Sequence, residues 1–168
     1  MDKSQLPFLS ATELGSLIKS QEVSPVEATE AYLERIPQID GKLNSYITVC
    51  RDEALAEAQQ AEKEIAAGNY RGPMHGLPVA VKDQFYTKGI RTTGGSVILK
   101  DLVPNEDATV VANLKAAGSV LLGKLNMSEY AMGDAFFHPF GTPHNPWDLS
   151  RNPGTSSSGS GAATAAFL

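Results

Sequence analysis

The chain has few of the residues that cross-link a secreted domain or bind a metal. It contains one cysteine, Cys50, and three histidines among 168 residues. A single cysteine excludes an internal disulfide, and His75, His138 and His144 lack the spacing of a compact His/Cys/Asp ligand set. We therefore predict no metal or other cofactor, and a small buried thiol in the reducing environment of the cytoplasm.

Positive charge and long apolar runs are also scarce. Lys and Arg number 14 against 19 Asp and Glu, which gives a net charge of -5. No run approaches the about 18 apolar residues that a membrane span requires. The N-terminal segment lacks the basic region and apolar core of a secretory signal. These absences argue against direct nucleic-acid binding, membrane association and secretion.

Helix and strand signals alternate along the chain. Ser10 and Ser24 each precede a glutamate with the spacing of a capping box, and the second of these helices is expected to run to about Arg35. Asp107 is expected to cap a later helix. The other elements are expected at 45–50 (strand), 53–67 (helix), 76–81 (strand), 107–117 (helix) and 119–122 (strand). This alternation predicts an α/β fold with a mixed or mostly parallel sheet.

Two segments near the end of the chain differ from this pattern. Residues 133–151 contain prolines, histidines and aromatic residues without clear periodicity, so we expect a long packed loop, which often borders a functional site. Residues 161–168 form a helix-forming run that stops without a glycine cap, a polar tail or a basic turn. We interpret this ending as a truncation.

A serine- and glycine-rich segment at 152–161 leads into an alanine-rich helix. Its composition is typical of a flexible linker, but a linker should join two domains, whereas the small residues at 162–166 suit a tightly packed helix. A phosphate-binding P-loop fits poorly, because that pattern needs a lysine where Ala162 follows Gly161. A third interpretation is catalytic and joins this segment to Lys82.

Lys82 lies at the end of the apolar strand expected at 76–81. Burial disfavours the ammonium form and lowers the pKa of a lysine, and a neutral lysine can act as a general base through a serine hydroxyl. The alternative is a salt bridge between Lys82 and Asp83 or another nearby carboxylate. The combination of Lys82 with the serine-rich segment favours catalysis.

Six motifs follow one another in order between Gly72 and Ser160. They are Gly72–Asp83 (GPMHGLPVAVKD), Gly89–Gly94 (GIRTTG), Asp107–Val111 (DATVV), Gly123–Glu129 (GKLNMSE), Asn145–Asp148 (NPWD) and Pro153–Ser160 (PGTSSSGS). In this order they resemble the motifs of the amidase signature family. The resemblance implies the amidase signature α/β fold, with a central mixed sheet flanked by helices, incomplete in this fragment.

The resemblance also implies a Ser-cisSer-Lys triad that hydrolyses carboxamides to an acid and ammonia or an amine. Lys82 matches the family's lysine, and Ser156 matches the bridging serine that follows a cis peptide bond. Ser157 is the adjacent alternative. The nucleophile of the family lies further along, in a motif resembling G-[TS]-D-x-G-G-S. Residues 1–168 are therefore expected to be the N-terminal part of a single amidase domain, truncated before the nucleophile and inactive alone.

The residues expected to contact a small amide substrate are Met132, Gly133, Asp134 and Ser157. The segment Met132–His138 departs from the serine-rich version associated with the glutaminase component of tRNA-dependent amidotransferases, which favours a stand-alone amidase that could form a homodimer. The alternative is that glutaminase component, which works with partner subunits. A second alternative is a non-catalytic binding or scaffold remnant.

Overall fold

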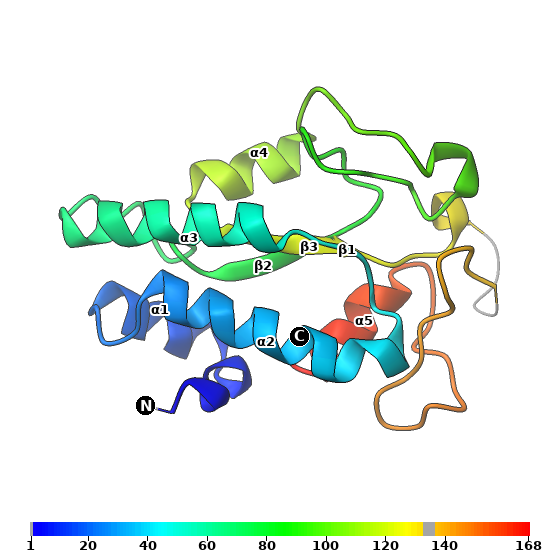
Figure 1. Cartoon of the computed structure of the whole chain (residues 1–168), viewed down its shortest axis with the longest axis horizontal. Coiled ribbons are helices and arrows are strands. Elements are labelled where there is room, and N and C mark those ends of the chain that lie inside the picture. The colour runs from blue at the N-terminus through cyan, green and yellow to red at the C-terminus, as the bar shows by residue number, and fades with distance from the viewer. Residues whose placement is uncertain (1, 133–136) are drawn as a thin grey trace.

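The computed structural model describes residues 2–132 and 137–168 (Figure 1). Within these ranges no helix combines the length and apolar character needed to cross a membrane. The elements, in chain order, are η1 (Lys3–Phe8), α1 (Ala11–Lys19), α2 (Pro25–Leu43), β1 (Tyr46–Val49), α3 (Arg51–Ala66), β2 (Pro78–Lys82), η2 (Val97–Leu99), α4 (Thr109–Ala116), β3 (Val120–Leu125), η3 (Glu129–Ala131) and α5 (Ser158–Ala165).

The three strands form a mixed sheet in the order β1-β3-β2, which confirms the expected α/β class. β3 is the middle strand and pairs antiparallel with β1 and parallel with β2. Its residues are buried along the whole strand. A strand covered on both faces is apolar throughout rather than alternating, and the run VLLGKL departs from this only at Gly123 and Lys124.

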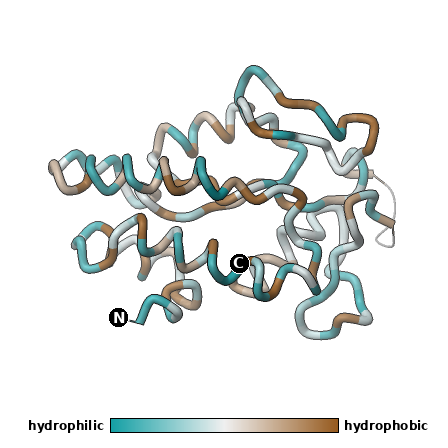
Figure 2. Tube along the Cα trace, in the orientation of Figure 1, coloured by the Kyte–Doolittle hydropathy of each residue, from teal (hydrophilic) through white to brown (hydrophobic). Residues whose placement is uncertain are grey.

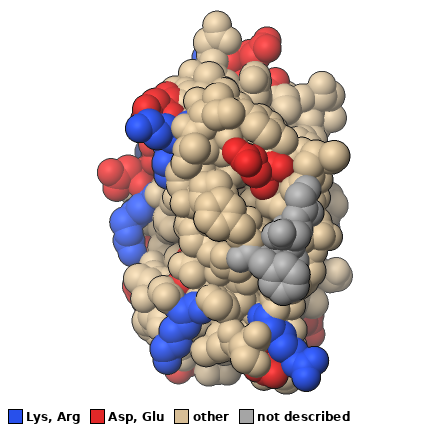
Figure 3. All heavy atoms as spheres, turned by 90° about the vertical axis from the view of Figure 1, so that its right-hand side faces the viewer, with Lys and Arg blue, Asp and Glu red and all other residues tan. Residues whose placement is uncertain are grey.

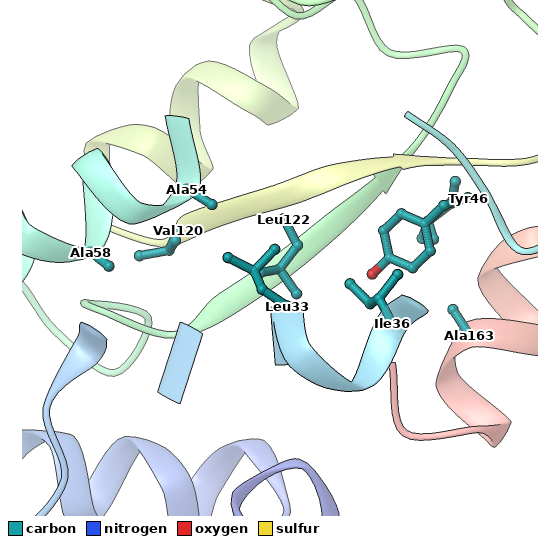
Figure 4. Close-up of a cluster of buried hydrophobic side chains, with 9 residues drawn as sticks. Leu33, Ile36, Tyr46, Ala54, Ala58, Val120, Leu122 and Ala163 are labelled. Atoms are coloured by element: carbon teal, nitrogen blue, oxygen red, sulfur yellow. The ribbon is translucent and has the colours of Figure 1, made fainter. Parts of the chain in front are cut away.

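Helices cover both faces of this sheet. On one face, side chains of α2 and α3 pack against β3, as Leu33, Ala54 and Leu122 illustrate (Figure 4). On the other face, Val111 of α4 packs with Leu121 of the same strand. Hydrophobic segments accordingly follow the strands, while hydrophobic and hydrophilic segments alternate along the helices (Figure 2). Alternate residues of β3 thus hold two helical layers together.

The capping boxes expected at Ser10 and Ser24 are both present and begin α1 and α2. However, α2 continues past the expected end at Arg35 to Leu43, and it contains Pro37. A proline inside a helix leaves the carbonyl four residues earlier without its usual donor. Here that carbonyl belongs to Leu33, and Arg51 donates to it with Nη2 at 3.2 Å. The substitute donor shows how the helix accommodates its proline.

The cap expected at Asp107 is wrong. Ala108 is the N-cap residue of α4 and makes no side-chain cap hydrogen bond. The Asp107 carboxylate instead accepts from the Lys88 backbone N–H at 2.7 Å and pairs with Lys115 Nζ at 2.9 Å. Two donors from outside the first turn therefore hold this carboxylate, and it fastens the loop before α4 to the end of the helix.

The serine-rich segment is not a flexible linker, because it enters α5 at Ser158, earlier than the expected helix, and packs against the sheet. Gly159 donates its N–H to Asn126 O at 2.9 Å. A Cβ at Gly159 would lie 2.3 Å from Ser45 O and 2.5 Å from Asn126 N. The backbone of α5 therefore approaches the end of β3 more closely than any side chain would permit.

We predict that Gly159→Ala lowers the free energy of unfolding by at least about 2 kcal/mol, because the neighbouring backbone atoms cannot move aside easily. Gly161→Ala is the matched control. It lies in the same helix, where an added Cβ would meet only Pro153 O, at 3.6 Å. It should be neutral or stabilising by up to about 1 kcal/mol. Urea unfolding measures both, and equal effects would contradict this packing argument.

Candidate active site

Lys82 is the last residue of β2 and is paired in register with Leu125 of β3. Its half-buried side chain reaches Ser156, and the two side-chain atoms Nζ and Oγ lie 2.6 Å apart. The salt bridge to Asp83, the alternative drawn from sequence, is not formed. The Asp83 carboxylate instead faces Lys124, at 3.4 Å. The strand end thus presents Lys82 to Ser156 rather than to Asp83.

Ser156 lies in the loop that precedes α5. The peptide bond between Thr155 and Ser156 is cis, as the resemblance implied. The Ser156 carbonyl accepts from the backbone N–H of Ser128 at 3.2 Å. Together with the Gly159–Asn126 hydrogen bond described above, this contact fixes the loop against the residues that follow β3. One strand and its continuation therefore position both Lys82 and Ser156.

Burial lowers the pKa of Lys82 below the ordinary lysine value of 10.5. Desolvation is the cause, because it penalises the ammonium form. A serine hydroxyl can both donate and accept a hydrogen bond, so Ser156 can bond to the neutral amine or to the ammonium. The pair can therefore carry a proton in either direction.

The other predicted site residues are placed only in part. Met132 follows η3, and its side chain is exposed. Ser157 is exposed at the N-cap position of α5 and makes no side-chain cap hydrogen bond. Gly133 and Asp134 lie outside the described residues. Between the two serines considered for the bridging position, the one hydrogen-bonded to Lys82 is Ser156.

Three further polar residues border this site. Asn126 donates with Nδ2 to Asn44 O at 2.9 Å and to Gly141 O at 2.7 Å, which joins β3 to the long loop. His138 Nε2 lies 3.0 Å from Ser158 Oγ, with both side chains buried. Asn126 belongs to the motif at 123–129, but the resemblance implied no role for it. The contact between His138 and Ser158 left no signal in the sequence.

A metal centre has no counterpart in the part of the chain that the structure describes. No group of three or more His, Cys, Asp or Glu side chains in residues 2–132 and 137–168 could hold a metal ion. The end of the molecule that carries the long loop shows mostly uncharged atoms in the middle of the view (Figure 3).

The chain belongs to the Amidase family, which it matches over residues 27–168. It is 53% identical over 159 residues to the A subunit of the glutamyl-tRNA(Gln) amidotransferase from Geobacter sp. (strain M21), covering 94% of this chain and 33% of that protein. It is 48% identical to the corresponding A subunit from Salinispora tropica over 163 residues, covering 96% of this chain and 33% of that protein. The chain thus spans about a third of the length of these curated relatives.

Solved structures show the same fold. The native peptide amidase of Stenotrophomonas maltophilia is 34% identical with a TM-score of 0.86, over 92% of this chain and 33% of that one. A fatty acid amide hydrolase is 29% identical with a TM-score of 0.92, over 99% of this chain and 30% of that one. The amidase signature fold predicted from the six motifs is confirmed.

We predict that the Lys82 amine titrates at lower pH in the folded chain than in the same chain unfolded in urea, because only folding desolvates it. Heteronuclear NMR of the labelled side chain measures both midpoints. A lowered pKa means that the charged amine destabilises the fold below the folded pKa, and that this penalty disappears above the unfolded pKa. Lys82→Met should therefore stabilise the chain at pH 7 more than at pH 11. A folded midpoint at or above the unfolded one would contradict the prediction.

Proposed function

We propose that this chain supplies Lys82 and Ser156 to a site that hydrolyses amides, and that the nucleophilic serine lies beyond Leu168. The observation that carries the proposal is the 2.6 Å contact between a desolvated lysine amine and a serine hydroxyl. A neutral lysine is a competent general base, and burial favours the neutral form. Membership of the Amidase family supports this chemistry.

In the proposed reaction, the nucleophilic serine adds to the amide carbonyl carbon while its proton passes to Ser156 Oγ. The Ser156 proton passes in turn to Lys82 Nζ, so that the lysine becomes an ammonium. The tetrahedral intermediate then breaks its carbon–nitrogen bond as the proton returns through Ser156 to the leaving nitrogen. Ammonia or an amine departs, and the acyl group stays on the nucleophile. Water releases the acid by the same proton route in a second cycle.

A more specific candidate is the glutaminase component of a tRNA-dependent amidotransferase. Curated relatives named as the A subunit of glutamyl-tRNA(Gln) amidotransferase are 47% to 54% identical to this chain, whereas the peptide amidase structure is 34% identical. This difference favours the amidotransferase component over the stand-alone amidase that the segment after Met132 suggested. The substrate would be glutamine, and the ammonia would pass to a partner subunit in the cytoplasm.

We predict that Lys82→Ala and Ser156→Ala each lower kcat of the complete protein by about 10²- to 10⁴-fold, because each removes a step of the proton transfer. Glutamine hydrolysis, followed as ammonia release, is the assay. Ser160→Ala is the matched control, since it removes a hydroxyl from the same segment without a contact to Lys82, and it should keep kcat within about threefold. Wild-type rates in Lys82→Ala would refute the proposed base. A complete protein that folds but hydrolyses no amide would favour the non-catalytic alternative.

The amidotransferase candidate predicts a dependence on partners. Co-expression with the other subunits of a glutamyl-tRNA(Gln) amidotransferase should yield a stable complex that amidates charged tRNA with glutamine as the nitrogen donor. Ser156→Ala should abolish the glutamine-dependent reaction but leave amidation with added ammonium salt, because free ammonia needs no hydrolysis step. A complete protein that elutes without partners and hydrolyses simple amides at full rate would instead identify a stand-alone amidase. The 168-residue chain alone should show neither activity.

A further inference from the structure

A second lysine lies beneath the site and is not used by the proposed reaction. Lys124, in the middle strand β3, is completely buried, and so is Asp83, the residue that follows Lys82. The Lys124 ammonium donates to Phe85 O at 2.8 Å and to Thr92 Oγ1 at 2.6 Å, and it lies 3.4 Å from Asp83 Oδ1. Two of the three ammonium protons are therefore in hydrogen bonds, and the contact with Asp83 Oδ1 is an ion pair, because that oxygen accepts no hydrogen bond from a described residue.

The carboxylate of Asp83 is held from its other side. Its Oδ2 atom accepts from the backbone N–H of Thr93 at 2.8 Å and from Thr93 Oγ1 at 2.5 Å. Thr92 completes the network by donating its own hydroxyl to Ile90 O at 3.1 Å. Buried charges are tolerated when both partners find such contacts, and breaking one partner leaves an uncompensated charge.

The backbone of Asp83 is fixed as well. Its N–H donates to Leu125 O at 2.9 Å, which extends the pairing of β2 with β3 by one residue. Its carbonyl accepts from the N–H of Gly94 at 3.2 Å. Both the main chain and the side chain immediately after Lys82 are therefore held in place. A shift of Asp83 would move the Cα of Lys82 directly.

We propose that Lys124 is a positioning residue for the Lys82–Ser156 pair, because its buried contact with Asp83 fixes the chain at the residue that follows Lys82. This proposal rests on the proposed function of that pair. Successive residues of a strand point to opposite faces, so Lys82 reaches Ser156 while Asp83 reaches Lys124 on the other side. Lys124 acts through Asp83, and its hydrogen bonds are to Phe85 and Thr92 rather than to Ser156.

A positioning role is distinct from a contribution to stability. The hydrogen bond between Lys82 and Ser156 is short, and proton transfer depends steeply on such a geometry. Loss of Lys124 should therefore lower kcat. It should change KM little, because Lys124 is completely buried and is not expected to contact the substrate. A residue that only stabilises the fold would lower the amount of active protein and leave kcat per folded molecule unchanged.

The experiment compares Lys124→Met with Lys124→Met/Asp83→Asn in the complete protein, with glutamine as the probe substrate. Lys124→Met leaves a buried carboxylate unpaired, and kcat per folded molecule should fall about 100-fold with KM changed by less than about threefold. The double variant removes that charge, and its kcat per folded molecule should be at least about tenfold higher than that of Lys124→Met. If Lys124→Met does not fold, Thr92→Val removes one of the two hydrogen-bond acceptors of Lys124 and should lower kcat about tenfold.

Two controls separate position from stability. Lys115→Met breaks the ion pair with Asp107, which involves the same two residue types but is partly exposed and lies near α4. Leu33→Ala removes a core side chain at the middle strand and should destabilise the protein by about 2 to 5 kcal/mol. Both should keep kcat per folded molecule within about threefold of wild type. If Lys124→Met or Thr92→Val folds and behaves as these controls do, the proposal is overturned.

The geometry itself gives a readout that does not need activity. A crystal structure of Lys124→Met or Thr92→Val should show Lys82 Nζ and Ser156 Oγ further apart than a hydrogen bond allows, with the pairing of β1 and β3 retained. If the wild-type protein hydrolyses no amide, the proposed function fails, and this distance alone decides the role of Lys124. An unchanged distance would overturn the positioning role even in an active enzyme.

Discussion

The burial of β3 on both faces is the constraint on which the rest of the structure depends. A strand that contributes Val120 and Leu122 to one helical layer and Leu121 to the other cannot shift by one residue, because the shift would exchange its two faces. Register is therefore strongly specified along this strand. β2 is paired with β3 up to Lys82, whose partner is Leu125. The position of Lys82 along the sheet is therefore determined by hydrophobic packing of β3 at a distance from the site.

The same strand determines where Ser156 lies. Beyond Leu125 the chain continues through Asn126 to Ser128, and its backbone groups bond to Gly159 and to Ser156. The approach at Gly159 is so close that only glycine fits. Two residues far apart in sequence thus meet because each is hydrogen-bonded to one rigid segment. Such support by a packed scaffold holds catalytic groups more accurately than a loop could alone.

The sequence predicted the parts of this structure that depend on local signals. Capping boxes at Ser10 and Ser24 are each contained within four residues, and the six ordered motifs identified the family. The predictions were wrong where a residue distant in sequence determines where a helix ends or which group a side chain binds. Pro37 was expected to lie beyond the end of α2, but the Arg51 side chain supplies the missing donor. The carboxylate of Asp107 was expected at a helix cap, but Lys88 and Lys115 hold it.

The pair formed by Asp83 and Lys124 illustrates the same limit within the site. Sequence offered Asp83 as a partner for its neighbour Lys82, which is the simplest choice for two adjacent opposite charges. The pleat of the strand prevents it, because adjacent side chains point to opposite faces. Nothing local indicates that Asp83 pairs with Lys124, since the two meet only after β2 and β3 have paired.

The two lysines show how one sheet can surround the same residue type with different partners. Burial lowers the pKa of both, but the Asp83 carboxylate opposes this effect at Lys124. At Lys82 the side-chain partner is a neutral hydroxyl, and desolvation is the cause of the shift. A lysine beside a carboxylate is suited to hold its charge, whereas a desolvated lysine beside a serine is suited to lose it. The alternation of side chains from Lys82, the last residue of β2, to Asp83 therefore directs the Asp83 carboxylate away from Lys82, which supports the proposed role of that lysine as a proton acceptor.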